Sequence, residues 1–353
     1  MLPKLLYLHP QSSTFIRKDI NFLSHHFAIR EHGFLLQNKA LLPRMFLRQL
    51  LFLALHLPSA SKVIVMFGGY HSFLPALMAK LFRKKCFIIL GGTDCTSYPS
   101  IDYGTFRKPF QGMLTGWSYK LSEALLPVHR SLMGHENTYY TEDGVSQGCQ
   151  AFVSSLFTPS VEIFNGYDAN QWSVGSKLPN SFVSVGYFDS KSRMRLKGCD
   201  LIQQVASDFP QCMFTIVGVA DSSLVRELPN LRVLNTVGQV ELKELFAQHR
   251  FYLQLSISEG FPNAICEAML SGCIPIGSNV NGIPEIIGDT GLVLLKRDLP
   301  LLCQVIQQAI AMPHQEEQGL RARKRISERF TIEARESKML QVLMNGVIPM
   351  RQT

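Results

Sequence analysis

Two glutamates eight positions apart form the pattern in this 353-residue chain that is best suited to chemistry. Glu259 and Glu267 enclose the stretch Gly260-Phe261-Pro262-Asn263, which predicts a tight turn that opens into a helix. Free backbone N–H groups at a helix start bind anions, and carboxylate oxygens accept hydrogen bonds from hydroxyl groups. A phosphate group with sugar hydroxyls on either side would satisfy both, so the motif favours a nucleotide-sugar as ligand.

The sequence around this motif predicts a strand, a loop and a helix. The apolar run 251–257 predicts the strand, and Pro262 suits the first position of the helix. The helix is expected to run through Glu267 to Ser271 and to end at Gly272. The loop therefore lies at the carboxyl end of a strand, where open parallel sheets bind their ligands.

Short apolar runs alternate with helical patterns along the whole chain, which predicts parallel sheets covered by helices on both faces. At 353 residues the chain is too long for one ordinary core, so two domains are expected. The polar stretch 165–180 predicts the hinge between them. The expected strands are 4–8, 27–31, 62–67, 86–90, 124–128, 181–185, 213–217, 232–234, 251–257, 273–276 and 292–295.

A basic loop follows the predicted strand 181–185 and supplies a second group of candidates. Gly186 ends the strand, and Arg193, Arg195 and Lys197 precede the next helix. A departing nucleoside diphosphate develops negative charge, which Lys, Arg and helix N–H groups stabilise when no metal is present. The alternative is a solvated basic loop that binds no ligand.

These motifs are similar to the donor-binding signature of GT-B glycosyltransferases, most like glycosyltransferase family 4 (glycosyl transferases group 1). The matching stretches are Lys197-Gly198, 258–269, 272–276, 281–287 and 291–293. The resemblance implies an α/β GT-B fold, in which two Rossmann-like parallel-sheet domains face a central cleft. It implies an N-terminal acceptor-side domain at 1–166, a C-terminal nucleotide-sugar-binding domain at 167–330, and a helical segment at 331–353 that packs back on the first domain.

The resemblance also implies roles for individual residues. Glu259 would contact the donor sugar, Glu267 would hold the nucleotide ribose, and the backbone from Gly260 to Asn263 would face the sugar and the diphosphate. The predicted catalytic residues are Glu259, Lys197 and Arg193. The predicted donor-binding residues are Glu267, Gly260, Phe261, Pro262, Asn263, Arg195 and Gly186.

Two departures from the family pattern bear on catalysis. Tyr187 stands where the family has an Arg directly after the strand glycine, so Arg193 or Arg195 is expected to supply the missing guanidinium. Gly91 stands where many relatives carry His. These departures leave open a catalytically inactive partner subunit of the same fold. A sugar-nucleotide 2-epimerase is the other alternative, and it would need acid and base groups in the first domain.

The acceptor side of the cleft is predicted in the first domain. Gly91-Gly92-Thr93-Asp94 follows the expected strand 86–90 and resembles the His-Gly-x-Asp of many relatives. The acceptor-side candidates are Asp94, Gly92 and His71, with Asp94 expected to bind donor or acceptor hydroxyls. A turn-capping role for Asp94 and a packing or helix-capping role for His71 are the structural alternatives.

The resemblance implies a retaining transfer of a sugar from a UDP- or GDP-sugar to a glycan or lipid-linked acceptor in cell-surface polysaccharide synthesis, such as lipopolysaccharide or capsule. In such enzymes the leaving diphosphate oxygen takes the acceptor proton, so no dedicated base is required. No Asp-x-Asp occurs, so neither a metal nor another cofactor is predicted. The lack of a Gly-x-Gly-x-x-Gly after the first strand and of a Walker loop argues against a nicotinamide dehydrogenase and against ATP hydrolysis.

Composition indicates a well-packed globular protein, with 46% hydrophobic and 18% charged residues. Eight scattered cysteines without a Cys-x-x-Cys pair favour a reduced, cytoplasmic compartment over a disulfide scaffold or a zinc site. Residues 1–10 are too soon broken for a signal peptide and predict a buried strand.

The positive charge is concentrated at the front of the chain. Residues 1–130 hold 16 of the 35 Lys and Arg but only 5 of the 27 Asp and Glu. With the apolar segment 45–57, which is too short to span a bilayer, this charge fits peripheral contact with an anionic membrane surface. An anionic acceptor or a solvated surface fits it equally. No nucleic-acid-binding module is recognised, so a nucleic acid is not an expected partner, and the oligomeric state stays open.

Overall fold

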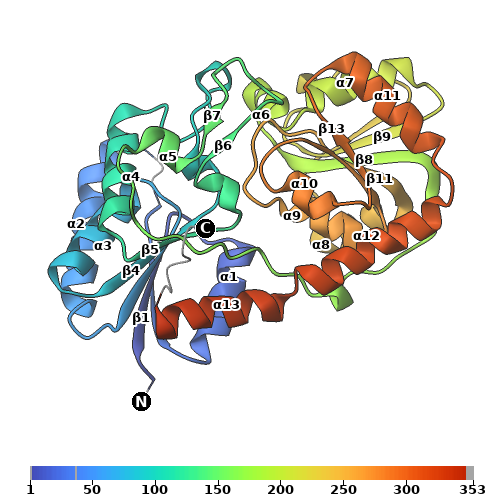
Figure 1. The fold of residues 1–353 in the computed structure, drawn as a ribbon. Helices are drawn as coiled ribbons and strands as arrows, with labels where there is room; N and C mark the ends of the chain where they lie inside the picture. Colours follow the sequence, from blue (N-terminus) through green and yellow to red (C-terminus); the bar gives the residue numbers. More distant parts are fainter. Residues whose placement is uncertain (1, 36–37, 347–353) are drawn as a thin grey trace.

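The computed structural model describes residues 2–35 and 38–346 of the chain. Two parallel β-sheets, each with helices packed on both faces, form two domains that lie side by side (Figure 1). Met1, residues 36–37 and residues 347–353 lie outside the described part, and with them the end of the helical segment predicted at 331–353. Each strand predicted from the sequence is present, which confirms the α/β class.

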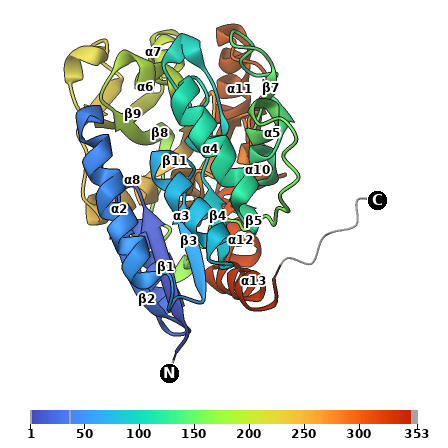
Figure 2. The same cartoon turned by 90° about the vertical axis from the view of Figure 1, so that its left-hand side faces the viewer.

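The N-terminal domain is built on a five-stranded parallel sheet with the order β2-β1-β3-β4-β5. Its elements are β1 (Lys4–His9), α1 (Thr14–Ser24), β2 (Ala28–Gly33), α2 (Leu42–His56), β3 (Lys62–Met66), α3 (Tyr70–Leu81), β4 (Lys85–Leu90), α4 (Pro109–Leu121), β5 (Ala124–Pro127), β6 (His135–Glu136), β7 (Ser146–Gln147) and α5 (Cys149–Phe152). The strands β1, β3 and β4 are apolar and buried, because helices cover both faces of the sheet. Figure 2 shows that α2, α3 and α4 cover its outer face.

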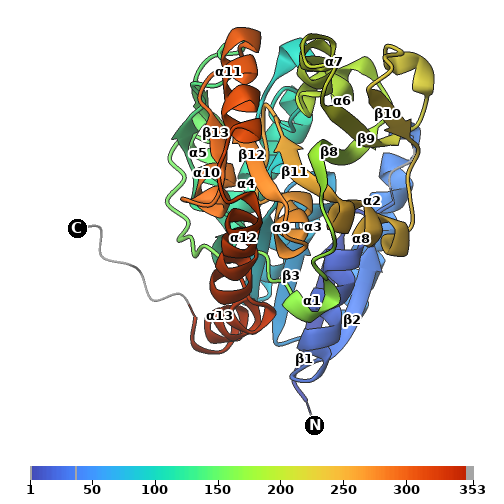
Figure 3. The same cartoon turned by 90° about the vertical axis from the view of Figure 1, so that its right-hand side faces the viewer.

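The C-terminal domain is built on a six-stranded parallel sheet with the order β10-β9-β8-β11-β12-β13 (Figure 3). Its elements are β8 (Leu178–Phe188), α6 (Lys191–Leu196), α7 (Cys199–Asp208), β9 (Met213–Val219), β10 (Leu231–Leu234), α8 (Gln239–Gln248), β11 (His249–Gln254), α9 (Asn263–Leu270), β12 (Ile274–Ser278), α10 (Ile283–Ile287), β13 (Leu292–Leu294), α11 (Leu299–Ile310) and α12 (Gln315–Arg329). Phe182 stacks on Phe214 and Phe251, with ring centroids 5.0 and 4.8 Å away, and these rings fill the middle of the sheet.

The last helix, α13 (Ile332–Asn345), returns to the N-terminal domain, where it lies beside α1. Arg335 is buried there and pairs with Asp19 at 2.8 Å, and it also donates to the carbonyl oxygens of Ile163 and Phe164. Where the chain crosses between the domains, Tyr167 N–H donates to Phe330 O at 2.9 Å. The two crossing segments therefore run side by side and form one hinge.

The two sheets turn the carboxyl ends of their strands toward each other. The loop after β4 touches the loop after β11 so closely that a Cβ on Gly260 would lie 2.1 Å from the carbonyl oxygen of Gly91. Gly92, whose φ is +133°, faces the backbone of Gly260 in the same contact. Any side chain at either place would force the loops apart, so the domains meet through glycine backbone at this point.

The strand before the Glu259 loop is shorter than predicted. β11 ends at Gln254, not at residue 257, because the next backbone groups bind other partners. Ile257 N–H donates to Leu196 O at 2.8 Å, and Leu255 O accepts from the Tyr139 hydroxyl at 3.3 Å. Pro262 was predicted as the first residue of α9 but is its N-cap, with a β-region ψ of 127°.

In residues 2–35 and 38–346, no helix is long and apolar enough to cross a lipid bilayer. The same part of the chain contains no group of three or more His, Cys, Asp or Glu placed to hold a metal ion. The core of each domain instead consists of apolar strands and the inward faces of its helices.

Candidate functional site

Glu259 lies in the loop after β11 with only 12% of its side chain exposed. Its Oε1 accepts hydrogen bonds from Ser256 Oγ at 2.8 Å and Gln254 Nε2 at 3.1 Å, and it forms an ion pair with Lys197. Among the described residues, Oε2 has no hydrogen-bond partner. Three donors thus fix one oxygen of the carboxylate and leave the other for a ligand hydroxyl or a developing positive charge.

Lys197 reaches Glu259 because the turn between α6 and α7 contacts the chain after β11 at two backbone positions. One is the hydrogen bond from Ile257 N–H to Leu196 O, and the other is the close approach of Gly198 to Leu255. Gly198 has a φ of +74°, and a Cβ on it would lie 2.3 Å from Leu255 O. Only glycine fits there, which gives the predicted Lys197-Gly198 pair a physical reason. The structure therefore brings the two predicted catalytic residues Lys197 and Glu259 together, although they are 62 positions apart in the chain.

The two arginines of α6 differ in their surroundings. Arg195 pairs with Glu142 of the N-terminal domain at 2.5 Å, and its guanidinium carbon lies 5.7 Å from the centre of the Tyr140 ring. Arg193 is exposed, and its guanidinium has no carboxylate partner within the described part of the chain. Arg193 is therefore the guanidinium that is available to a ligand, whereas Arg195 joins the two domains.

Tyr103, in the N-terminal domain, responds electrostatically to residues of the C-terminal domain. Burial raises the pKa of the Tyr103 phenol well above its usual range, Glu259 raises it further and Arg193 lowers it. Tyr103 therefore lies within electrostatic reach of both Glu259 and Arg193, although it comes from the N-terminal domain. The Tyr103 hydroxyl hydrogen-bonds to Thr93 Oγ1 at 2.7 Å. Sequence reasoning missed Tyr103 because nothing in its local pattern distinguishes it from a packing tyrosine.

Tyr187 and Gly186, at the end of β8, have different surroundings. Tyr187, which replaces the family's arginine, is 59% exposed. Gly186 lies in β8 against the chain at Gly218, where an added Cβ would come 1.8 Å from Gly186 O. Gly186 thus packs closely against Gly218 of β9, and its contact with a donor stays a prediction.

A cavity of about 190 Å³ lies between the domains beside Glu259. The C-terminal domain contributes Gly260, Phe261, Pro262 and Asn263 to its wall, and donor binding by these residues stays a prediction. The side-chain amide of Asn263 is held in place, because its Oδ1 accepts from Asn165 Nδ2 at 3.1 Å and from the Tyr167 hydroxyl at 2.8 Å. The N-terminal side of the wall is formed by Phe15, Met66, Phe67, Ile89, Gly91 and Val128.

Glu267 does not open onto the same cavity as Glu259. It lies in the second turn of α9 and lines a smaller cavity of about 40 Å³ between α9 and α1. Burial raises the pKa of the Glu267 carboxyl, while Lys18 and Lys243 act in the opposite direction. Phe15, Asn165, Asn263 and Arg335 line both cavities, so the two cavities are neighbours.

Asp94 is an internal anchor of the loop after β4 and is only 2% exposed. Its oxygens accept from the backbone N–H groups of Gly68, Gly91 and Gly92 at 2.9 to 3.0 Å and from the Tyr119 hydroxyl at 3.1 Å. Burial raises the pKa of Asp94, and these backbone bonds partly offset the rise. The structure thus shows the turn-capping alternative, and contact of Asp94 with a hydroxyl stays a prediction.

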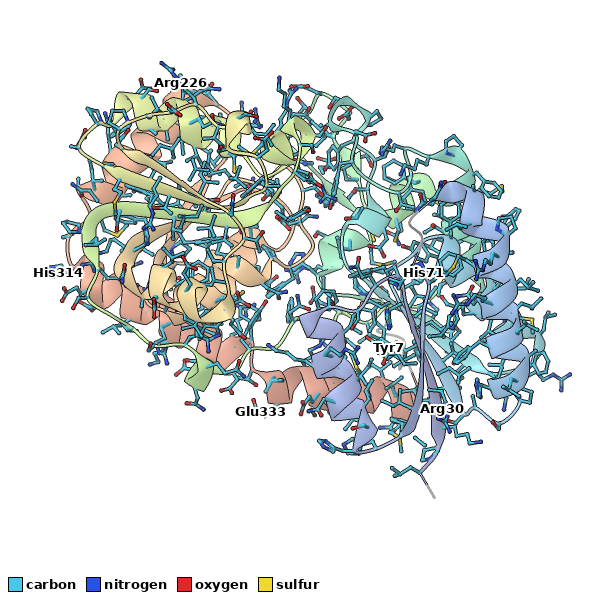
Figure 4. The ribbon with its side chains drawn as sticks, turned by 180° about the vertical axis from the view of Figure 1, so that it is seen from behind. Tyr7, Arg30, His71, Arg226, His314 and Glu333 are labelled. Carbon is cyan, nitrogen blue, oxygen red and sulfur yellow. The ribbon has the colours of Figure 1, made fainter. Side chains whose placement is uncertain are left out.

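His71 lines a third cavity, of about 290 Å³, within the N-terminal domain. Its Nε2 donates to Met66 O at 2.8 Å, and burial lowers the pKa of the ring to about 4, so the ring is neutral near pH 7. Figure 4 shows His71 in the interior of this domain, while Arg226 and His314 lie at the far rim of the other. Phe67, in a left-handed conformation with a φ of +67°, and Gly91 line both this cavity and the one beside Glu259.

Asn281 connects the Glu259 loop to the N-terminal domain and was missed by sequence reasoning. Its Oδ1 accepts from Glu259 N–H at 3.1 Å, and its Nδ2 donates to Ser131 Oγ at 3.0 Å. Nearby, Glu285 pairs with His129 at 3.1 Å and with Arg329 at 2.6 Å. The only signal for these residues was their place in the 281–287 stretch of the donor motif, which does not predict contacts across the cleft.

Residues 180–312, which include Lys197, Glu259 and Glu267, match the family model described as Glycosyl transferases group 1. Curated relatives that match part of this chain include O-antigen chain mannosyltransferase B from Escherichia coli, 36% identical over 80 residues, or 23% of this chain and 21% of that protein. N-acetyl-alpha-D-glucosaminyl L-malate synthase from Bacillus anthracis is 39% identical over 108 residues, or 29% and 28%. The matched segments thus span about a quarter of the length of these relatives.

Solved structures resemble nearly the whole chain, including the part outside residues 180–312. Sucrose-phosphate synthase from Thermosynechococcus elongatus superposes with a TM-score of 0.70 at 13% identity, over 97% of this chain and 98% of that one. Anabaena Alr3699/HepE in complex with UDP and glucose gives 0.69 at 14% identity, over 97% and 99%. At these identities the likeness shows the fold alone. The chain has the GT-B fold, with two parallel-sheet α/β domains, as predicted.

Proposed function

We propose that the protein is a retaining, metal-independent glycosyltransferase that moves a hexose from a UDP- or GDP-sugar to a glycan or lipid-linked acceptor. The observation that carries this proposal is the Glu259 carboxylate, held by Lys197 on one oxygen and open on the other, at the cavity between the domains. Similar proteins add support, since they include an O-antigen chain mannosyltransferase and a protein solved in complex with UDP and glucose. A role in cell-surface polysaccharide synthesis, at a cytoplasmic location, is part of the proposal.

The chemistry follows from where charge develops. When the bond between the sugar and the diphosphate breaks, the sugar becomes oxocarbenium-like and the diphosphate oxygen becomes more negative. Lys197, which pairs with Glu259, and Arg193, which acts electrostatically on Tyr103 as Glu259 does, would stabilise the departing diphosphate, together with the N–H groups at the start of α9. The open Oε2 of Glu259 would face the sugar. The diphosphate oxygen would take the proton of the acceptor hydroxyl as the new glycosidic bond forms, so the step requires no separate base.

One observation favours a different function, a partner subunit that binds a nucleotide-sugar without transferring it. Tyr187 replaces the family's arginine and points its ring into solvent, so the diphosphate has one fewer fixed cation than in the family pattern. A binder of this kind would keep the Glu267 contact and lose turnover.

The deciding experiment combines donor binding with product analysis. A thermal-shift screen of UDP- and GDP-sugars should identify the donor, because a ligand at about 100 times its Kd stabilises the folded state by roughly 2.7 kcal/mol. NMR of the products with candidate acceptors then separates transfer, epimerisation and binding alone. Transfer with retained anomeric configuration supports the proposal. Binding without any product would establish the partner-subunit alternative, and no binding of any nucleotide-sugar would remove both.

A further inference from the structure

The helix α2 presents an apolar surface to solvent on the N-terminal domain. Its inward face consists of Met45, Gln49 and Leu53, which are buried. The opposite side of the helix carries Leu47, Leu51 and Leu55, which are 56%, 62% and 73% exposed. A surface helix of a water-soluble domain normally turns its apolar stripe inward and its polar side outward. This helix is apolar on both sides, so its outer side needs an explanation in terms of a contact.

The apolar surface continues over the neighbouring helices. On α4, Phe110, Met113 and Trp117 follow a helical spacing and are 57%, 42% and 47% exposed. Between α2 and α4 lies α3, whose half-buried Phe73 contacts the Trp117 ring at a centroid distance of 5.8 Å. Figure 2 shows the three helices together on one side of the domain. We call this surface the outer face, with the exposed apolar residues Leu47, Leu50, Leu51, Leu55, Leu81, Phe110, Met113 and Trp117.

The outer face carries cations and no carboxylates. From residue 32 to residue 93 the sequence contains eight Lys and Arg and no Asp or Glu, and from 103 to 122 it contains three Lys and Arg and no Asp or Glu. These two stretches include all of α2, α3 and α4. Arg44, Arg48, Lys80 and Lys120 are exposed on these helices, and none of them has a carboxylate partner among the described residues.

We propose that the outer face docks on a lipid bilayer that contains anionic lipids. Exposed leucine and aromatic side chains would enter the headgroup and acyl boundary, while the arginines and lysines around them would meet lipid phosphates. A second copy of the chain fits this face poorly, because a symmetric contact would set the same unpaired cations against one another. The charge therefore selects an anionic surface over self-association.

The 290 Å³ cavity lies where it could receive an acceptor from the membrane, and this step rests on the proposed function. Tyr70 and Gln111 line the cavity, and the Tyr70 ring contacts Phe110 of the outer face at 6.2 Å. The cavity therefore opens at the edge of the surface that would contact the membrane. A lipid-linked acceptor in that membrane would bring its polar head to the cavity while its lipid stays in the bilayer.

The test is vesicle flotation of the full-length protein. Vesicles of phosphatidylcholine alone and of phosphatidylcholine with phosphatidylglycerol are compared at low and high salt. We expect binding to the anionic vesicles that weakens as salt is added. Leu51→Glu should abolish it, and Arg44→Ala and Arg48→Ala should each weaken it about fivefold. Val240→Glu is the matched control, because Val240 is 74% exposed on α8 of the other domain and should leave flotation unchanged.

Each outcome decides the proposal. Equal binding of wild type and Leu51→Glu, or binding to phosphatidylcholine that salt does not affect, would overturn it. A dimer in light scattering that Leu51→Glu dissociates, without vesicle binding, would assign the face to a second copy instead. Thermal melts of each variant show whether the fold is kept. Donor binding, measured separately by thermal shift, tests the proposed function, so a loss of one leaves the other standing.

Discussion

Two carboxylates at the ends of parallel strands, Asp94 after β4 and Glu259 after β11, show how differently the two domains use the same group. Asp94 gives its oxygens to three backbone N–H groups and a tyrosine hydroxyl and is 2% exposed. Glu259 gives one oxygen to three side chains and keeps the other without a partner in the described chain. Full satisfaction makes Asp94 an anchor, whereas partial satisfaction leaves Glu259 able to act on a ligand.

The comparison extends to the surfaces behind these loops. In the C-terminal domain, Lys197–Glu259 and Arg297–Asp200 form partly buried ion pairs. On the outer face of the N-terminal domain, Arg44, Arg48, Lys80 and Lys120 have no carboxylate partner among the described residues. The proposed donor site thus has paired charges, whereas the surface proposed to meet a membrane has unpaired cations.

Glu259→Gln is the strongest test of the comparison. The amide keeps the shape and can still accept from Ser256, but it removes the negative charge next to the reacting sugar. We expect turnover to fall about 100- to 1,000-fold, which is the usual effect of losing one preorganised electrostatic group. Turnover is measured by the release of the nucleoside diphosphate. The melting temperature should change little.

The exposed Glu227→Gln is the control for Glu259→Gln and should keep wild-type turnover. Wild-type turnover in Glu259→Gln itself would show that the open oxygen has no chemical role. The two carboxylates would then both be structural, and the distinction drawn between them would be wrong.

Asp94→Ala should lower stability and leave donor binding unchanged, the reverse of the effects expected for Glu259→Gln. Three backbone N–H groups and the Tyr119 hydroxyl would lose their acceptor inside the protein, and buried groups left without a partner cost about 1–3 kcal/mol. We expect the free energy of unfolding in urea to fall by at least that amount. Donor affinity of the folded fraction should stay close to wild type, since the Glu259 loop is intact. A stable variant that loses only acceptor binding would instead make Asp94 a substrate ligand.

The sequence predicted the features that depend on residues close together in the chain, and it did not predict the contacts between the domains. The strands, the loop at Glu259 and the Lys197-Gly198 pair depend on local apolar runs and on glycine, so they could be read from the chain. Contacts across the cleft could not. Asn281 bonds both Glu259 and Ser131, and Arg193 acts electrostatically on Tyr103, because two domains pack together and no local pattern encodes that.

Arg193 and Arg195 test the comparison within one helix. Arg193→Ala should lower turnover about 10- to 100-fold, because a hydrogen bond to a charged phosphate is worth about 1.5–3 kcal/mol. Arg195→Ala should lower it less than about fivefold, because its partly exposed pair with Glu142 contributes at most about 1 kcal/mol. Steady-state kinetics of both variants with the same donor measure the difference. The reverse order would show that Arg195 leaves Glu142 when the donor binds and replaces the arginine lost at Tyr187.

The pH dependence of stability provides the smallest and most specific test. Burial lowers the pKa of His71 to about 4, whereas a histidine in the unfolded chain titrates near 6.5. The unfolded state therefore binds a proton at pH 5 that the folded state excludes, so the stability contributed above about pH 6.5 is lost as the pH falls toward 4. Between pH 7.5 and pH 5 the loss of stability is about 2 kcal/mol.

Urea unfolding of His71→Gln tests this pH dependence, because the amide can still donate to Met66. Its free energy of unfolding should change by about 2 kcal/mol less between these pH values than that of wild type. The exposed His314→Asn should match wild type. An unchanged slope in His71→Gln would mean that the ring is charged inside the N-terminal cavity, and the acceptor side would then hold a cation where the structure shows a neutral group.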